Sequence, residues 1–266
     1  SYVGTAISAP LMSFLIINLS WRYAYIVIAI IGILWAIIWK QISKDLYDTN
    51  EITSKVKLSK ENVFSCIVNR KVLGMSIGFF CYNYIKNFYL TWFPSYLVSE
   101  KGFSILKVGI WGMLPSIAAV FGGLIAGTIT DKMISNGHSK TLSRKLPLCV
   151  GLICSGSIVF ADSVHSGYLA VALLSFSFAM AIAASPSIWA IPGDIAPDSN
   201  LVGTIGGIQN TVSNIAGIVA PIITGYIIYK TGGFKVALLA SGIISCIGAF
   251  SYIFVVGKLE AIDIGN

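Results

Sequence analysis

The stretch VLGMSIGFFCYNYIKNFYLTWFPSYLV, residues 72–98, decides the fold class. It carries a single charge, that of Lys86. A helix needs about 20 predominantly apolar residues to cross the hydrocarbon core of a bilayer, so this stretch predicts a membrane-spanning helix. Its apolar residues form a continuous run instead of alternating with polar ones, which argues against a strand.

The rest of the chain repeats this pattern. Of its 266 residues, 56% are hydrophobic and only 11% are charged, whereas a soluble domain carries about 25% charged residues. We therefore predict an all-α polytopic membrane protein with lipid around most of its surface. Its eight expected spans are Tyr2–Asn18, Arg22–Trp39, Val72–Val98, Val108–Ile129, Leu146–Ala161, Gly167–Ala190, Val202–Tyr229 and Phe234–Val256.

The basic residues predict the orientation. They concentrate in the linker Lys40–Lys71 and in the loop Asp131–Lys145, which lie on the same side if every span is real. The positive-inside rule makes that side cytoplasmic and places both ends of the chain there. It also explains the net charge of +7 without a nucleic-acid partner.

The long linker divides the spans into two and six. Many transporters consist of six-helix halves, which indicates the last two helices of a first half followed by a complete second half. The chain opens at Ser1 and enters an apolar run almost at once, so we expect its beginning to be missing. The expected parts are residues 1–40 for the two helices, 41–70 for the linker, 71–258 for the second half and 259–266 for a cytoplasmic tail.

Lys86 is the most informative position. It lies roughly 18 Å from either end of its span, and a charge at the centre of a bilayer costs at least about 2.5–3.5 kcal/mol. Lys86, Asn87 and Thr91 follow Asn83 at spacings of three, four and eight residues, so the four side chains share one helix face. A cation beside amides suits an anion, so we predict a substrate-binding face here, with Tyr82 one turn away. Alternatively, Lys86 is neutralised by burial or pairs with a carboxylate elsewhere.

The span Val202–Tyr229 carries a second polar stripe, formed by Gly206, Asn210, Ser213, Asn214 and Gly217. Amides facing lipid would lack hydrogen-bond partners, so we expect Asn210 and Asn214 to face protein or water. The glycines indicate close approach of another helix. Gln209 points off this stripe.

Nothing in the sequence indicates catalysis. The five cysteines are scattered without metal-ligand or disulfide spacing, and His138 and His165 stand apart from any candidate nucleophile. There is no phosphate-binding Gly-x-x-x-x-Gly-Lys motif. We expect no enzyme activity, no catalytic residue, no metal and no cofactor.

Several motifs resemble the major facilitator superfamily. Between two spans stands Gly127-x-x-x-Asp131-Lys132, similar to the loop signature of that family. Further segments resemble its anion:cation symporter branch, whose bacterial members import sugar acids such as glucarate, galactarate, galactonate and hexuronates. These segments are GTAISAP (4–10), TWFPSYL (91–97), KGFSILKVG (101–109), DKMISNGHSKTLSRK (131–145) and GTIGGIQNTVSNIAGIVAPIITGY (203–226).

This resemblance implies alternating-access uptake of an organic anion, coupled to a proton, by a monomer in the plasma membrane. The proton-coupling carboxylates of the family lie mainly in its first four helices, which this chain lacks. Asn210 matches the binding-site asparagine of the family's GG-x-x-N pattern. Lys86 departs from the importers, which often have an uncharged residue there, and this indicates a different anion.

The resemblance also implies a gate. Asp131 would latch the outward-facing state against a helix of the opposite half, with Lys132 and Arg144 in the same network; alternatively it is a solvated loop charge. Asp194 and Asp198 are expected to cap the following helix. A facilitator or exchanger of another carboxylate, and a transporter-like solute sensor, stay open as alternative functions.

Overall fold

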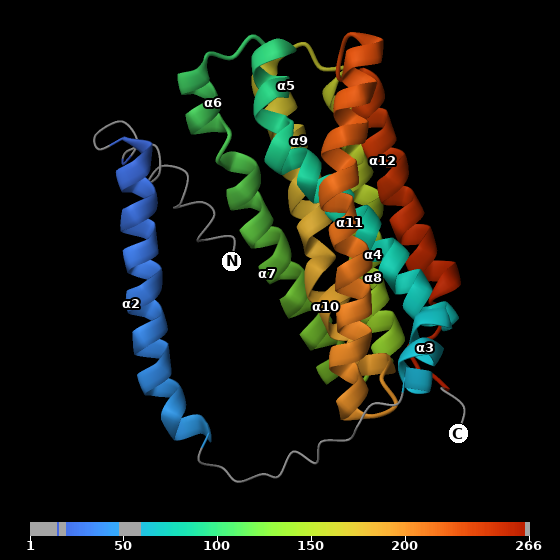
Figure 1. Cartoon of the computed structure of the whole chain (residues 1–266). Helices are drawn as coiled ribbons and strands as arrows, with labels where there is room; N and C mark the ends of the chain where they lie inside the picture. Colours follow the sequence, from blue (N-terminus) through green and yellow to red (C-terminus); the bar gives the residue numbers. More distant parts are fainter. Residues whose placement is uncertain (1–14, 16–19, 48–59, 264–266) are drawn as a thin grey trace. The chain divides into compact units, whose positions relative to one another are not determined.

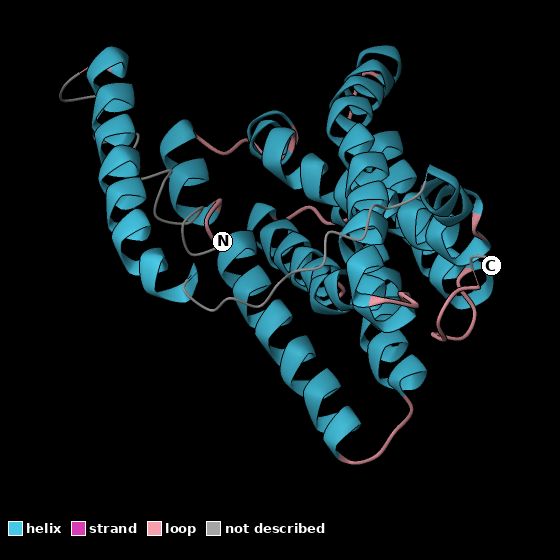
Figure 2. Ribbon diagram, turned by 60° about the horizontal axis from the view of Figure 1, so that its bottom comes forward, coloured by secondary structure: helices cyan, strands magenta, loops and turns pink. Residues whose placement is uncertain are grey.

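A computed structural model describes residues 15, 20–47 and 60–263 (Figure 1). Every regular element in these residues is helical, as Figure 2 shows. The predicted all-α class is therefore confirmed for the described part of the chain. The chain divides into two units, residues 1–57 and residues 58–266, and each is described by itself.

The first unit contains helix α2 (Trp21–Tyr47). Its apolar part, Trp21–Ser43, has 23 residues and is long enough to cross a bilayer. The helix expected at Arg22–Trp39 is thus confirmed, with a polar extension at its end. The span expected at Tyr2–Asn18 lies outside the described residues, apart from Leu15.

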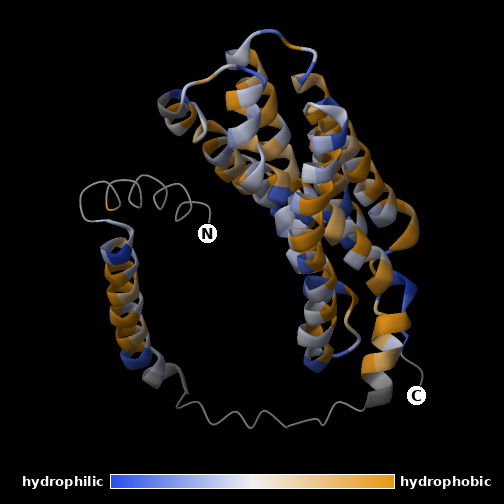
Figure 3. Cartoon of the chain, turned by 45° about the horizontal axis from the view of Figure 1, so that its top comes forward, coloured by the Kyte–Doolittle hydropathy of each residue, from blue (hydrophilic) through white to orange (hydrophobic). Residues whose placement is uncertain are grey.

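The second unit contains all the other described helices. They are α3 (Lys60–Val68), α4 (Arg70–Thr91), α5 (Phe93–Ser99), α6 (Ile105–Trp111), α7 (Leu114–Ser135), α8 (Lys140–Ser155), the 3-10 turn η1 (Gly156–Ala161), α9 (Gly167–Ala183), α10 (Ser185–Ile195), α11 (Ser199–Thr231), α12 (Lys235–Phe250) and the π-helical turn η2 (Ser251–Val255). Figure 3 shows hydrophobic residues along these helices, with hydrophilic ones at several helix ends and also within the bundle.

Six helical segments in the described residues are long and apolar enough to span a membrane. The first is in α2, and the others are Lys107–Ser135, Lys140–Ala161, Gly167–Ile195, Ser199–Thr231 and Lys235–Val255. Helix α4 has 22 residues and is about 33 Å long, but it is more polar than these six. The count of eight spans therefore stays a prediction.

Prolines interrupt three of the expected spans. Helices α4, α6 and α9 each end just before Pro94, Pro115 or Pro186, and a new helix begins with the proline in its first turn. Proline lacks the N–H that would continue the preceding helix, and its ring clashes with the turn before it. The spans expected at Val72–Val98, Val108–Ile129 and Gly167–Ala190 are therefore each divided into two helical segments.

Helix α4 packs closely against α12 and against the π-helical turn η2 that follows it. A Cβ on Gly78 would overlap the Tyr252 ring, so only glycine permits this approach. The Tyr252 hydroxyl donates to the Met75 carbonyl (3.2 Å), and Ser251 Oγ donates to the Gly74 carbonyl (2.7 Å). These contacts fix the face that α4 turns toward α12 and leave its Asn83 face for α11.

Candidate functional site

Helix α4 carries the predicted polar stripe. Asn83 is buried, with 7% of its surface exposed, while Lys86 and Asn87 are half-buried. Among the residues that the structure describes, Lys86 has neither a hydrogen-bond partner nor a carboxylate within ion-pair distance. The alternative of a carboxylate partner therefore finds no support within the described residues.

Helix α11 runs beside α4 in the same direction. The Asn83 side-chain amide donates to the Ser213 carbonyl at 3.3 Å. One turn further along both helices, a Cβ on Gly217 would lie 3.9 Å from the side-chain amide atoms of Asn87. The two predicted stripes thus meet at Ser213 and Gly217, as the close-approach interpretation of the glycine expects.

Asn210 and Asn214 lie on the exposed side of the same α11 stripe. The Asn214 side-chain amide donates to the Asn210 carbonyl at 2.8 Å and to Asn210 Oδ1 at 3.2 Å. The two side chains therefore form one polar patch, one turn long. Within the described residues, Lys86 makes no hydrogen bond with either of them.

Gln209 faces away from this patch and is almost fully buried, with 1% of its surface exposed. Its Nε2 donates to the Ile188 carbonyl at 3.2 Å. That carbonyl stands four residues before Pro192, which lies inside α10 and has no N–H to offer it. The Gln209 amide thus replaces the helical hydrogen bond that Pro192 cannot make, which gives this residue a structural role.

Aromatic residues border the stripe on the side of α10. The Trp189 ring packs edge-on against Phe79, with centroids 5.3 Å apart, and Phe79 lies 5.7 Å from the Tyr82 ring. Tyr82 is buried at 2% exposure, whereas Trp189 is 56% exposed. Trp189 therefore presents an uncovered aromatic face close to the helix turn that precedes Lys86.

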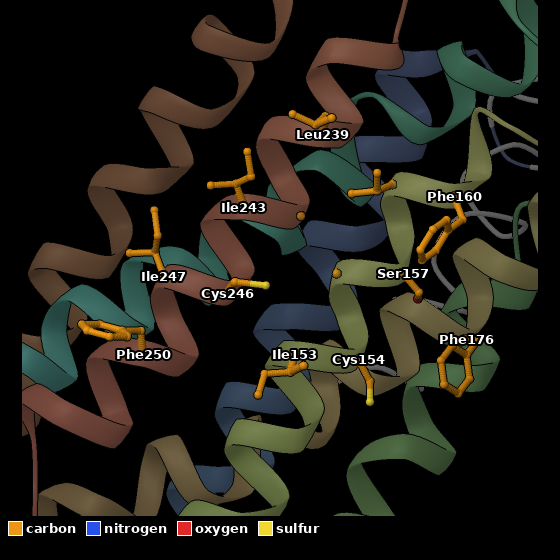
Figure 4. A pocket seen from close by; sticks show the side chains of 13 residues that line it. Ile153, Cys154, Ser157, Phe160, Phe176, Leu239, Ile243, Cys246, Ile247 and Phe250 are labelled. Atoms are coloured by element: carbon orange, nitrogen blue, oxygen red, sulfur yellow. The ribbon is translucent and has the colours of Figure 1, made fainter.

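A large apolar groove of the second unit lies elsewhere. It has a volume of about 890 Å³ and is bounded by α8, η1, α9 and α12 (Figure 4). Its lining is aliphatic and aromatic, with Cys154, Cys246 and Ser157 as the most polar members. Lacking charged and amide groups, this groove cannot recognise an anion, and the chemistry favours the α4–α11 stripes as the binding site.

Apart from these two regions, Arg144 on α8 forms an ion pair with Asp194 on α10. Arg144 Nε donates to Asp194 Oδ2 at 3.0 Å, and the two side chains are 20% and 12% exposed. The sequence predictions missed this pair. Asp131 and Lys132 are exposed near the end of α7, so their place in a gate stays a prediction.

The two expected capping residues have different outcomes. Asp198 is the N-cap of α11, as predicted, and accepts hydrogen bonds from the Asn200 side chain and main chain and from Ser199, which lower the pKa of its carboxyl group. The expected capping role of Asp194 is wrong. Helix α10 continues to Ile195, because Gln209 compensates for Pro192, and this directs Asp194 toward Arg144.

The arrangement suits a ligand that carries both charge and hydroxyl groups. An ammonium group stabilises a carboxylate, and side-chain amides can both donate to and accept from hydroxyls. No group of three or more His, Cys, Asp or Glu side chains suited to a metal occurs in the described residues.

Comparison with known proteins decides the family. The sequence model of the Major Facilitator Superfamily matches residues 1–221 of the chain. The chain belongs to the major facilitator superfamily. The resemblance that the motifs predicted is thereby confirmed, and with it the expectation that the chain is not an enzyme. This major facilitator chain is a multi-pass membrane protein.

Relatives of the chain bear the names of sugar-acid transporters. It is 32% identical to the probable galactarate/D-glucarate transporter GudP of Bacillus subtilis, over 98% of this chain and 62% of the relative. It is 31% identical to the D-galactonate transporter of an Escherichia coli strain, over 98% of this chain and 65% of that relative. It is 32% identical to the hexuronate transporter of B. subtilis, over 90% of this chain and 59% of that relative. The chain spans less than two thirds of the length of these relatives.

Proposed function

We propose that a protein carrying this sequence is a secondary transporter that imports an organic anion of the sugar-acid class by proton symport with alternating access. The observation that carries this proposal is Lys86, a half-buried cation on α4 without a counter-charge in the described residues. The names of the relatives support a sugar acid as the cargo. A hydroxylated carboxylate matches the combination of one cation with several amides.

Each residue of the site has a proposed role. Lys86 would hold the carboxylate of the substrate, because it supplies the positive charge of the site. Asn83, Asn87, Asn210 and Asn214 would contact hydroxyl groups, and Tyr82 would border the bound molecule. Asp131, Lys132 and Arg144 would form the gate at the ends of α7 and α8. The ion pair between Arg144 and Asp194 shows that Arg144 can bind a carboxylate there, which supports this proposal.

The proposed arrangement in the membrane follows the sequence predictions. Eight spans would comprise the last two helices of a first half, residues 1–40, and the six of a second half, residues 71–258. Residues 41–70 and 259–266 would lie in the cytoplasm, and the protein would act as a monomer in the plasma membrane. The proton-binding carboxylates would belong to the family's first four helices.

Uptake into proteoliposomes tests the proposal. The protein carrying this sequence would be offered a panel of labelled sugar acids and other carboxylates, with and without an inward proton gradient. Uptake of one acid that rises with the gradient is expected. Gradient-independent exchange would favour an exchanger, and the absence of uptake of any anion by folded protein would refute the proposal.

Matched lysine variants link this activity to the site. Lys86→Gln is expected to abolish specific uptake, while Lys235→Gln, at an exposed position at the start of α12, is expected to leave it unchanged. Equal uptake by the two variants would show that transport does not depend on the α4 stripe. It would refute the assigned role of Lys86.

A further inference from the structure

Helix α3 carries an exposed apolar stripe next to a membrane span. It ends at Val68, and α4 begins at Arg70, with only Asn69 between them. Phe64, Ile67 and Val68 are 67%, 42% and 57% exposed and share one helix face at spacings of three and four residues.

The opposite face of α3 is anchored to the protein. Cys66 is completely buried there, so the apolar stripe cannot simply turn inward. Because α4 begins immediately after Asn69, the stripe adjoins the first turn of the helix that the sequence predicts to span the membrane.

Three cations gather beside this stripe, at the carboxyl end of the last helix. Each donates to a main-chain carbonyl: Arg70 Nη2 to Phe254 (2.9 Å), Lys71 Nζ to Glu260 (2.9 Å) and Lys145 Nζ to Ile253 (3.5 Å). Carbonyl groups carry no formal charge, so these hydrogen bonds position the cations without neutralising them. In Figure 3 the hydrophobic colour of α3 adjoins the hydrophilic colour at the start of α4, near the C-terminal end.

We propose that α3 and the cations Arg70, Lys71 and Lys145 form a binding site for anionic phospholipids of the adjacent leaflet. Phe64, Ile67 and Val68 insert between the acyl chains, and the three cations bind the phosphate of the headgroup. Short helices with one apolar face and flanking cations bind membrane surfaces in this way. The apolar stripe selects a lipid over a free phosphate ion, because a free ion offers it nothing to contact.

The site would hold α3 against the membrane at the end of α4. The proposal requires that the second unit spans the bilayer, and it does not depend on the nature of the transported solute. A failed uptake assay would therefore leave it unaffected.

Photo-cross-linking identifies what covers the stripe. The photoreactive residue p-benzoylphenylalanine replaces Phe64 in the protein carrying this sequence, reconstituted in vesicles of phosphatidylcholine and phosphatidylglycerol. Mass spectrometry is expected to find adducts on lipid acyl chains. The same replacement at Asn136, an exposed residue in the turn after α7, serves as the matched control and is expected to give none. An adduct between position 64 and another protein segment, or no adduct at all, would overturn the proposal.

Native mass spectrometry tests the cations. Wild-type protein released from mixed bilayers is expected to retain phosphatidylglycerol in preference to phosphatidylcholine, even with excess inorganic phosphate present. Combined Arg70→Gln, Lys71→Gln and Lys145→Gln substitutions should remove this preference. The control Lys140→Gln, an exposed cation at the start of α8, should keep it. Displacement by inorganic phosphate, or an unchanged preference in the triple variant, would contradict the assigned site.

Discussion

Replacing Lys86 with methionine separates a substrate-binding lysine from a structural one. Methionine keeps an unbranched side chain of similar length and removes the charge. If Lys86 binds the substrate, the protein tolerates an uncompensated charge in the membrane because substrate binding requires that charge. The variant is therefore expected to bind substrate more weakly and to unfold less readily.

Both effects have magnitudes that can be worked out. A hydrogen bond to a charged group contributes about 1.5–3 kcal/mol, which corresponds to about a 10- to 150-fold rise in Kd for the anion. A lysine at the centre of a bilayer costs about 2.5–3.5 kcal/mol. Lys86 is half-buried, so its removal should recover roughly half of this cost, about 1–2 kcal/mol in the free energy of unfolding.

Two measurements on purified protein check the prediction. Isothermal titration gives the Kd for the transported acid, and thermal unfolding in detergent without substrate gives the stability. Lys86→Arg preserves the charge and should retain measurable binding. Lys235→Met makes the same substitution at an exposed position and should change neither quantity.

The reasoning would be refuted by the opposite pattern. A variant that unfolds at a lower temperature than wild type would show that Lys86 pairs with a carboxylate outside the described residues. Breaking such a buried pair leaves the other charge uncompensated and destabilises the protein. A variant with an unchanged Kd and raised stability would instead show that Lys86 does not contribute to substrate binding.

Three further predictions concern the framework of the second unit. A double-mutant cycle with Arg144→Gln and Asp194→Asn should give a coupling energy of about 1 kcal/mol, because the pair is partly exposed; additive effects in thermal unfolding would contradict it. Gln209→Leu should cost about 1–3 kcal/mol of stability by leaving a buried carbonyl unpaired, while the Kd for substrate stays unchanged. The hydrogen bonds from Asn200 lower the pKa of Asp198, so the stability it contributes should be complete above about pH 4 and lost as the pH falls through the lowered pKa. An Asp198→Ala variant whose unfolding has the same pH dependence as wild type would exclude that contribution.

The spans and the polar stripes could be predicted because they depend on local periodicity. Lys86 and its amide neighbours repeat along one face of one helix, and a helix fixes their relative positions whatever surrounds it. The partners across helices could not be predicted in this way. Asn83 meets Ser213 130 residues later, and Arg144 meets Asp194 50 residues later. Such contacts depend on which helices are neighbours in the folded unit.

Gln209 and Asn210 show what the local sequence can predict and what depends on contacts with other helices. They are adjacent amides in a polar segment, and on a helix their side chains point about 100° apart. This angular separation predicts that only one of the two side chains belongs to the exposed stripe. It cannot predict that the other compensates for a proline on a different helix, because the Ile188 carbonyl becomes available only through Pro192. A proline inside a membrane helix thus indicates that some donor must exist, and the fold decides that Gln209 provides it while Asn210 stays exposed.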